Sequence, residues 1–211
     1  MISEHPWNQV PLEDYERHMQ HDSVAQLQLL NTLTGKYLQI VKPETALFLG
    51  IAGGNGLDQI DSTVTKKIVG LDINAKYLDE TRKRYQIRLP QLELIQIDID
   101  SSANLSIVKA DWFWAALVLE YVDLANCFSF IQKNITSNGN LIITLQQNNG
   151  LQSVSKTGVH SIQCLGQVFR EIPEDQLLKH AEEKGFELLE TEVNDLPNGK
   201  SFKTYLFTKN Q

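Results

Sequence analysis

A glycine-rich segment and one aspartate are spaced as they would be in a site that holds a nucleoside. Residues 50–56 read GIAGGNG and directly follow a short apolar run. Glycines at a strand-to-helix turn let the backbone approach a ligand closely and adopt positive φ, and the helix expected next would add free N–H groups. Asp72 stands 22 residues after Gly50, at the end of a second apolar run. Its carboxylate could accept one hydrogen bond from each hydroxyl of a ribose.

Each of these features also has a purely structural explanation. A glycine-rich turn can be a tight connection and nothing more, and an aspartate after a strand can cap the following helix. The spacing between the loop and Asp72 favours the ribose role over the cap. Asp98 ends a third apolar run in a similar way. For Asp98, the sequence supports two roles equally: a turn or cap residue, and a contact with an adenine.

The elements that would position these residues alternate between strands and helices. The strands expected from apolar runs are residues 46–49, 67–71, 92–97, 112–119, 140–145, 186–193 and 201–208. Helical patterns occupy residues 74–88, 128–134 and 174–184, and the stretch after the glycines is also compatible with a helix. This alternation predicts an α/β fold, a Rossmann-like three-layer sandwich with a mostly parallel seven-stranded sheet.

The two ends of the chain depart from this alternation. Apolar residues at spacings of three and four predict one or two helices within residues 12–41, stopped by Lys42-Pro43. The last two strands flank Asn198-Gly199, a turn signal that predicts an antiparallel C-terminal hairpin. We expect residues 1–42 to form a helical cap and residues 43–211 to form one compact domain. The polar connection 146–168 is long enough to predict a functional or mobile loop.

Composition narrows the class of protein. The chain has 211 residues and a formal net charge of −7. This charge argues against a protein that binds nucleic acid by neutralising phosphates. Two cysteines, Cys127 and Cys164, are too few for a disulfide framework. The start of the chain lacks a signal-peptide pattern, and the longest apolar run falls far short of the roughly 20 residues that span a bilayer. These features predict a soluble cytoplasmic protein with no membrane partner.

The glycine spacing also bears on the kind of nucleotide. The dinucleotide pattern G-x-G-x-x-G fits badly, because its second and third glycines would be Ala52 and Asn55. The sequence instead resembles the class I S-adenosylmethionine-dependent methyltransferases. The segments that carry the resemblance are LFLGIAGGNGL at 47–57, VGLDIN at 69–74, IQIDID at 95–100 and DWFWAALVLEYVD at 111–123. The terminal hairpin matches the reversed last strand of that family, and the leading helices resemble its variable cap.

Two positions depart from the family pattern. Phe48 stands where the family usually carries an acid, two residues before the first glycine. The resemblance then implies that backbone carbonyls or another acid hold the methionine amino group. Ala52 replaces the middle glycine, and its methyl group is tolerable if φ at this position is negative.

The resemblance implies S-adenosylmethionine as the cofactor and a small molecule as the methyl acceptor. The residues that would line its methionine and ribose side are Gly50, Ile51, Ala52 and Gly54. Asp72 would hold the ribose hydroxyls and Ile73 would pack on the adenine, with Asp98 and Ile99 at the adenine edge. Leu119, Glu120 and Tyr121 would lie below the transferable methyl group. No metal is expected.

Methyl transfer by in-line displacement asks mainly for correct positioning, which can supply roughly 7–11 kcal/mol of barrier reduction in favourable cases. A general base is needed only when the acceptor arrives protonated. The candidates are Glu120, Tyr121 and His18, while His21 and His160 read more simply as surface residues. Residues 155–161 are expected to contact the acceptor, because they interrupt the regular pattern after the fifth strand.

Two other functions remain open at this point. A protein that keeps the fold and binds a ligand or partner without methyl transfer is consistent with Phe48 and with the lack of an obvious base. A nicotinamide-dependent dehydrogenase is disfavoured by the glycine spacing and by the terminal hairpin. Oligomeric state cannot be deduced from the sequence.

Overall fold

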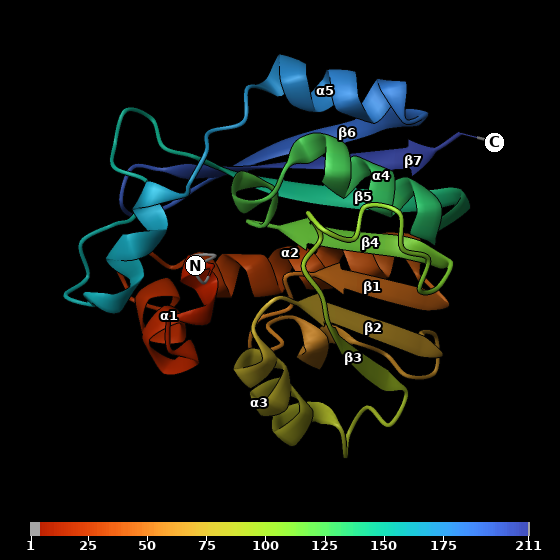
Figure 1. Cartoon of the computed structure of the whole chain (residues 1–211), viewed down its shortest axis with the longest axis horizontal. Coiled ribbons are helices and arrows are strands. Elements are labelled where there is room, and N and C mark those ends of the chain that lie inside the picture. The colour runs from red at the N-terminus through yellow and green to blue at the C-terminus, as the bar shows by residue number, and fades with distance from the viewer. Residues whose placement is uncertain (1–4, 211) are drawn as a thin grey trace.

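Seven strands form one sheet in the order β3-β2-β1-β4-β5-β7-β6 in the computed structural model, which describes residues 5–210 (Figure 1). Residues 1–4 of the predicted cap lie outside the described residues. The strands are β1 Thr45–Leu49, β2 Lys67–Asp72, β3 Leu92–Gln96, β4 Ala110–Ala116, β5 Ile135–Gln147, β6 Phe186–Asp195 and β7 Ser201–Lys209. The first five pair in parallel, and β7 pairs antiparallel with both β5 and β6. The predicted fold class is confirmed.

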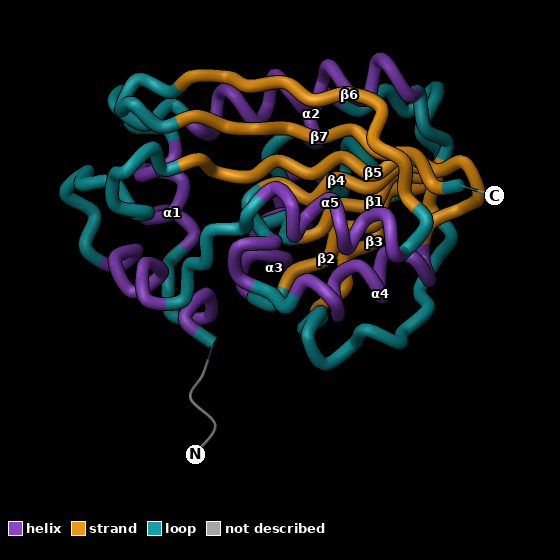
Figure 2. Tube along the Cα trace, turned by 90° about the horizontal axis from the view of Figure 1, so that it is seen from above, coloured by secondary structure: helices purple, strands orange, loops and turns teal. Residues whose placement is uncertain are grey.

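Alternating side chains of the strands build a core on each face of the sheet. Leu47 and Leu49 of β1 point to the face covered by α4 (Leu124–Asn134) and α5 (Glu174–Glu183). Phe48 points to the other face, where α2 (Gln26–Val41) and part of α3 (Ala75–Tyr85) pack. This alternation follows from the two-residue period of a strand, and it makes three layers. Figures 1 and 2 show the layers from two directions.

The helix expected directly after the glycines is not present, and this part of the prediction is wrong. Residues 50–66 connect β1 to β2 through turns and a single 3₁₀ turn, Leu57–Gln59. Helix α2 occupies the adjoining space: a Cβ on Gly56 would lie 2.7 Å from Thr34 of α2. Asn55 Nδ2 also donates a hydrogen bond to the Leu27 carbonyl at 3.0 Å. Parallel strands usually need a crossover helix to cover the sheet, and here α2 supplies that cover.

The N-terminal segment and the long connection after β5 pack together at one end of the molecule. Helix α1 spans Leu12–Met19, and the connection contains a 3₁₀ helix, Ser161–Gln167. Val10 shares a small apolar cluster with Ile162 and Leu165 of that 3₁₀ helix. Figure 1 shows these segments side by side, next to the end of the sheet where β1 and β4 finish. Two distant parts of the sequence therefore form one cover over that end.

The C-terminal hairpin follows the prediction closely. Strands β6 and β7 are joined by residues 196–200, where Gly199 adopts φ +83°. Lys200 lies in this turn with its side chain buried, and its ammonium donates a hydrogen bond to the Ser153 carbonyl at 2.7 Å. No helix within residues 5–210 is both long enough and apolar enough to cross a membrane.

Candidate functional site

The carboxyl ends of β1, β2 and β4 meet at one edge of the sheet. The chain runs from β1 to β2 on one side and returns to β4 on the other, so this edge is the point where the strand order reverses. In open α/β sheets, ligands bind in the crevice at such a point. The glycine-rich segment leaves β1 here, Asp72 ends β2 and Ala116 ends β4.

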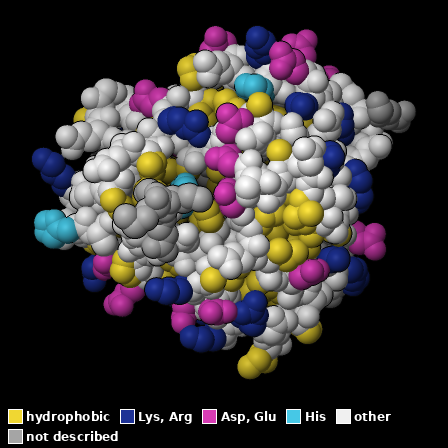
Figure 3. Space-filling model, in the orientation of Figure 1, with side chains coloured by type: hydrophobic (Ala, Val, Ile, Leu, Met, Phe, Trp, Pro, Cys, Tyr) yellow, Lys and Arg dark blue, Asp and Glu magenta, His cyan; other side chains and the backbone are white. Residues whose placement is uncertain are grey.

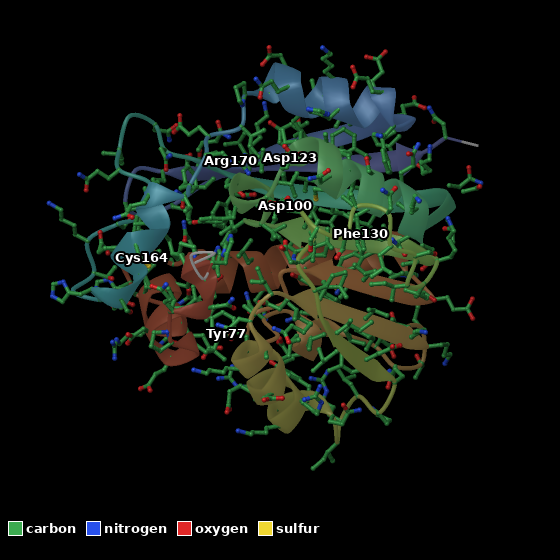
Figure 4. All side chains as sticks on the ribbon, in the orientation of Figure 1. Tyr77, Asp100, Asp123, Phe130, Cys164 and Arg170 are labelled. Atoms are coloured by element: carbon green, nitrogen blue, oxygen red, sulfur yellow. The ribbon has the colours of Figure 1, made fainter. Side chains whose placement is uncertain are left out.

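A cavity of about 710 Å³, counting its open mouth, lies at this edge, and we call it the rim cavity. Six of the predicted cofactor residues and one candidate catalytic residue line it: Gly50, Ala52, Asp72, Ile73, Asp98, Ile99 and Tyr121. Asp100 and Tyr77, labelled in Figure 4, also line it, from the segment after β3 and from α3 respectively. The structure therefore brings residues from four separate motifs to one cavity.

Asp72 contacts the glycine-rich turn directly at the wall of this cavity. Its Oδ2 accepts a hydrogen bond from the Ala52 N–H at 2.9 Å, and its Oδ1 accepts one from the Asn74 N–H at 2.8 Å. The side chain is only 8% exposed, and this burial raises its pKa to about 6 against the opposing effect of those backbone donors. Each carboxylate oxygen keeps room for another donor. Asp72 lines the cavity, so acceptor capacity that the backbone donors leave unused is directed at a ligand there.

Ala52 corrects an expectation about backbone geometry. Its φ is +47°, in the left-handed region, whereas the sequence analysis required a negative φ for the alanine to be tolerated. The turn holds it there from two sides, because its N–H binds Asp72 and its carbonyl accepts a hydrogen bond from Thr81 Oγ1 at 2.7 Å. An L-residue in this region costs roughly 1–2 kcal/mol, which the two hydrogen bonds offset.

Three predicted cofactor residues do not line the rim cavity. Ile51 is buried in the core behind the turn. Gly54 adopts φ +85° and faces Tyr85, whose ring would lie 2.7 Å from an added Cβ. Leu119 is buried in the core on the α4 face. Leu117 and Val118 take its place at the wall, since the chain turns at Leu117 with φ +55°.

Phe48 is also a core residue, and its ring packs on Trp112 with centroids 5.1 Å apart. An acid nevertheless lies close to the glycine turn. Glu16 of α1 forms an ion pair with Arg84 of α3 directly over Gly53. Together with Gly50 and Ala52, Glu16 lines a further cavity between α1 and the end of β4. An acid from the N-terminal helix thus lies beside the turn, where it is paired with Arg84.

Aromatic residues of the N-terminal segment close one side of the rim cavity. Trp7 packs edge-on against Tyr15 and Tyr121, with ring centroids 5.5 and 5.1 Å away. The segment is tied to α3, since Asn74 Nδ2 donates to the Trp7 carbonyl at 2.9 Å and the Tyr77 hydroxyl donates to the Val10 carbonyl at 2.9 Å. Trp7 was not predicted from the sequence as a site residue. The only indication in the sequence is that this tryptophan stands within an otherwise polar segment.

A second cavity of about 480 Å³, counting its open mouth, adjoins the first, and we call it the inner cavity. The residues that line both cavities are Trp7, Tyr15, Leu117 and Tyr121. The inner cavity extends under the cover formed by α1 and the 161–167 helix. Glu120, His18 and Tyr121, the three candidate catalytic residues, all line it. His21 and His160 are exposed and line neither cavity.

Glu120 is the most buried ionisable group of the inner cavity, with 1% of its surface exposed. Its Oε1 accepts a hydrogen bond from the Gln146 N–H at 2.9 Å, and its Oε2 has no partner among the described residues. Burial raises the pKa of Glu120 to about 7. Such a carboxyl group can exchange a proton near neutral pH.

His18 differs from Glu120 in its charge state. Burial, with a smaller effect from Lys200, lowers the pKa of His18 to about 4. Its Nδ1 lies 2.7 Å from the Thr157 hydroxyl. Thr157 belongs to the segment 155–161 that was expected to contact the acceptor. No residue of this segment lines the inner cavity, whereas the preceding Ser153 and Val154 do. His18 is therefore a neutral ring near neutral pH.

The mouth of the rim cavity is acidic. Asp98 and Asp100 line it, and Asp100 Oδ1 accepts a hydrogen bond from the Asp123 N–H at 2.7 Å. Figure 3 shows acidic side chains in a row beside a hollow on this face, and Figure 4 shows Asp100 and Asp123 close together. A wall of one sign attracts ligands of the opposite charge. Within residues 5–210, however, no cluster of three or more such side chains is placed to hold a metal ion.

No protein-family description matches this sequence, and no protein of curated function matches it. Solved structures do match it in shape. Magnesium protoporphyrin IX methyltransferase (ChlM) from Synechocystis PCC 6803, with bound S-adenosylhomocysteine, superposes with a TM-score of 0.70. The match has 15% identity and covers 97% of this chain and 96% of that one. The chain has the class I methyltransferase fold.

Two more solved structures show that proteins with this fold differ in function. N-methyltransferase NodS from Bradyrhizobium japonicum WM9, in complex with S-adenosylhomocysteine, gives a TM-score of 0.66 at 15% identity, covering 95% of this chain and 98% of that one. The [4+2]-cyclase SpnF gives a TM-score of 0.68 at 12% identity, covering 89% and 82%. Because a cyclase shares the fold, the fold alone does not determine the reaction.

Proposed function

We propose that this protein is an S-adenosylmethionine-dependent methyltransferase that acts on a small molecule. The observation that carries the proposal is Asp72, a buried carboxylate at the wall of the rim cavity that is held against the glycine turn by the Ala52 N–H. Ribose hydroxyls would donate to this carboxylate. S-adenosylmethionine supplies a methyl group that is already activated on a sulfonium sulfur.

The other walls fit the remaining parts of the cofactor. Ile73 and Ile99 offer apolar side chains for the adenine ring, and Asp98 offers an acceptor at its edge. Gly50 and Ala52 bring backbone close to the methionine portion. Glu16 would hold its ammonium group by exchanging part of its pairing with Arg84. The solved structures of ChlM and NodS that share this fold contain S-adenosylhomocysteine, which is consistent with this assignment.

The inner cavity is the proposed acceptor site. It adjoins the rim cavity at Tyr121 and lies beneath the cover, so an acceptor there would be shielded from water. An acceptor held there would lie in line with the methyl group, which is the main requirement of a displacement. Glu120 is the residue that would accept a proton. Tyr121 stays a neutral phenol because burial raises its pKa, and neutral His18 lines the opposite wall.

The test is titration calorimetry with S-adenosylmethionine and S-adenosylhomocysteine. We expect both to bind, and we expect Asp72→Asn to weaken binding about tenfold or more, since a hydrogen bond to a charged group contributes about 1.5–3 kcal/mol. Asp22→Asn, which removes an exposed carboxylate away from both cavities, is the matched control. Folded wild-type protein that binds neither compound contradicts the proposal.

A second candidate function is a protein that binds the cofactor without transferring its methyl group. Phe48 favours it, because the strand has lost the acid that the family usually carries there. Radiolabelled S-adenosylmethionine distinguishes the two functions. Label recovered in an acceptor supports the methyltransferase, whereas tight binding with no transfer to a broad panel of small molecules supports the second function.

A further inference from the structure

The inner cavity contains a buried carboxylate that has no cation beside it. Glu120 Oε2 is enclosed and has no partner among residues 5–210. No lysine or arginine lines the cavity. A buried charge is costly unless it is paired. The protein therefore keeps at this place an acceptor that its own side chains do not satisfy.

No nearby basic side chain of the described residues pairs with this carboxylate. Lys200 donates to the Ser153 carbonyl at 2.7 Å, outside the cavity lining. Arg170, labelled in Figure 4, is bonded to the Glu120 carbonyl through its backbone N–H at 3.0 Å, and its side chain is exposed. His18 is neutral near pH 7, because burial lowers its pKa to about 4. None of the three pairs with the Glu120 carboxylate.

The amide groups of the cavity also donate within the protein. The Gln146 amide donates to Asn148 Oδ1 at 2.7 Å and to the Ser153 carbonyl at 2.8 Å, and the Gln26 amide donates to Gln146 Oε1 at 2.6 Å. Asn148 in turn donates to the Glu171 carboxylate at 2.6 Å. Because a carboxylate and a carbonyl only accept, they fix the direction of the whole chain of hydrogen bonds. Both N–H groups of the Gln146 amide are consequently used, whereas the Gln26 amide uses one of its two in this chain.

Aromatic rings surround the same space. Trp7, Tyr15, Tyr121 and Phe169 all line the inner cavity. Tyr121 lies between Trp7 and Phe169, with ring centroids 5.1 and 5.8 Å away. Aromatic faces attract cations, and the attraction is stronger where water is excluded. The cavity thus combines an unpaired carboxylate, aromatic rings and a Gln146 amide whose two N–H groups are already used.

We infer that the methyl acceptor is an amine that enters the inner cavity as an ammonium and directs an N–H at Glu120 Oε2. This inference rests on the proposed function. The nitrogen first gives a proton to Glu120, which frees its lone pair. That lone pair forms the new N–C bond, the C–S bond breaks, and its electron pair stays on sulfur, which becomes a neutral thioether. An acceptor with a carboxylate or phosphate at this point would meet an uncompensated negative charge.

The experiment compares three probes that share one ring and differ in the head group: benzylamine, benzyl alcohol and benzoate. Calorimetry at pH 8 measures each on protein saturated with S-adenosylhomocysteine. We expect benzylamine to bind at least tenfold more tightly than benzyl alcohol, and benzoate not to bind. This comparison uses only the wild-type protein, so its result does not depend on whether a variant folds. Glu120→Gln should lower the affinity for benzylamine at least tenfold, whereas Glu187→Gln, which changes an exposed glutamate of β6, should not change it.

The possible failures are distinguishable. Protein that does not bind S-adenosylhomocysteine overturns the proposed function itself. Protein that binds it but takes up none of the three probes overturns the amine assignment alone. The same follows if benzyl alcohol or benzoate binds as tightly as benzylamine, or if Glu120→Gln leaves the affinity for benzylamine unchanged.

Discussion

The buried carboxyl group of Glu120 should make the free energy of unfolding depend on pH. Its pKa in the folded protein is about 7, raised by burial from an ordinary value of 4.5. Between these two values the folded chain binds the proton more strongly than the unfolded chain. The stabilisation is therefore complete below pH 4.5 and is lost as the pH rises through 7. At about 1.36 kcal/mol per pKa unit, the loss between pH 5 and pH 8 is about 2.5 kcal/mol.

Two neighbouring groups also make the free energy of unfolding depend on pH, and a difference measurement must remove their effects. Asp72, with a pKa raised to about 6, contributes with the same sign. His18, with a pKa lowered to about 4 from 6.5, contributes with the opposite sign, since its stabilisation is lost as the pH falls. Urea unfolding of wild type and Glu120→Gln at several pH values cancels both. Relative to the variant, wild type should lose about 2.5 kcal/mol from pH 5 to pH 8.

The matched control is Glu187→Gln, an exposed glutamate on β6 whose pH profile should stay parallel to that of wild type. Parallel profiles for Glu120→Gln and wild type would refute the reasoning, because they would mean that Glu120 titrates like an exposed carboxyl group. A wild type that gains stability over Glu120→Gln as the pH rises would refute it more strongly. That result requires a cation of the protein paired with the carboxylate.

The remaining predictions concern the glycine turn and its cover. Ala52→Gly should raise the free energy of unfolding by up to about 1 kcal/mol in urea denaturation, because φ is +47° at this position. A clear loss of stability would contradict the left-handed conformation assigned to Ala52. Gly54→Ala should lower the free energy of unfolding by about 2–4 kcal/mol. The added Cβ would lie 2.7 Å from the Tyr85 ring, and φ at this position is +85°. Gly150→Ala, with φ +79° and no atom within 4 Å, is its matched control and should cost only about 1–2 kcal/mol. Trp7→Ala should weaken S-adenosylhomocysteine binding about tenfold in calorimetry, because the ring forms part of both cavity walls; unchanged affinity would remove Trp7 from the site.

The sheet was predictable because local patterns decided each strand. The runs around Leu47, Val69 and Leu141 are apolar on both faces, as buried parallel strands are, and Asn198-Gly199 marked the hairpin. The meeting of Asp72 with the glycine turn followed from the same topology, since parallel strands end at a common edge. These features depend on short stretches of sequence, and the structure reproduces them.

Features that depend on contacts between distant segments were not predictable in this way. The helix expected after Gly50 is absent because α2, from earlier in the chain, fills its place. The positive φ of Leu117 moves Leu119 from the cavity wall into the core, and no residue type signals such a turn. The unpartnered oxygen of Glu120 likewise depends on the closure of the 161–167 helix over α1.

The most direct test of the account is a crystal structure with bound S-adenosylhomocysteine. The account predicts the adenosyl group in the rim cavity, with both ribose hydroxyls at hydrogen-bonding distance, about 2.6–3.0 Å, from the Asp72 carboxylate. It also predicts the sulfur at the boundary with the inner cavity, near Tyr121. A nucleoside bound elsewhere, or a ribose that does not contact Asp72, would contradict the central claim.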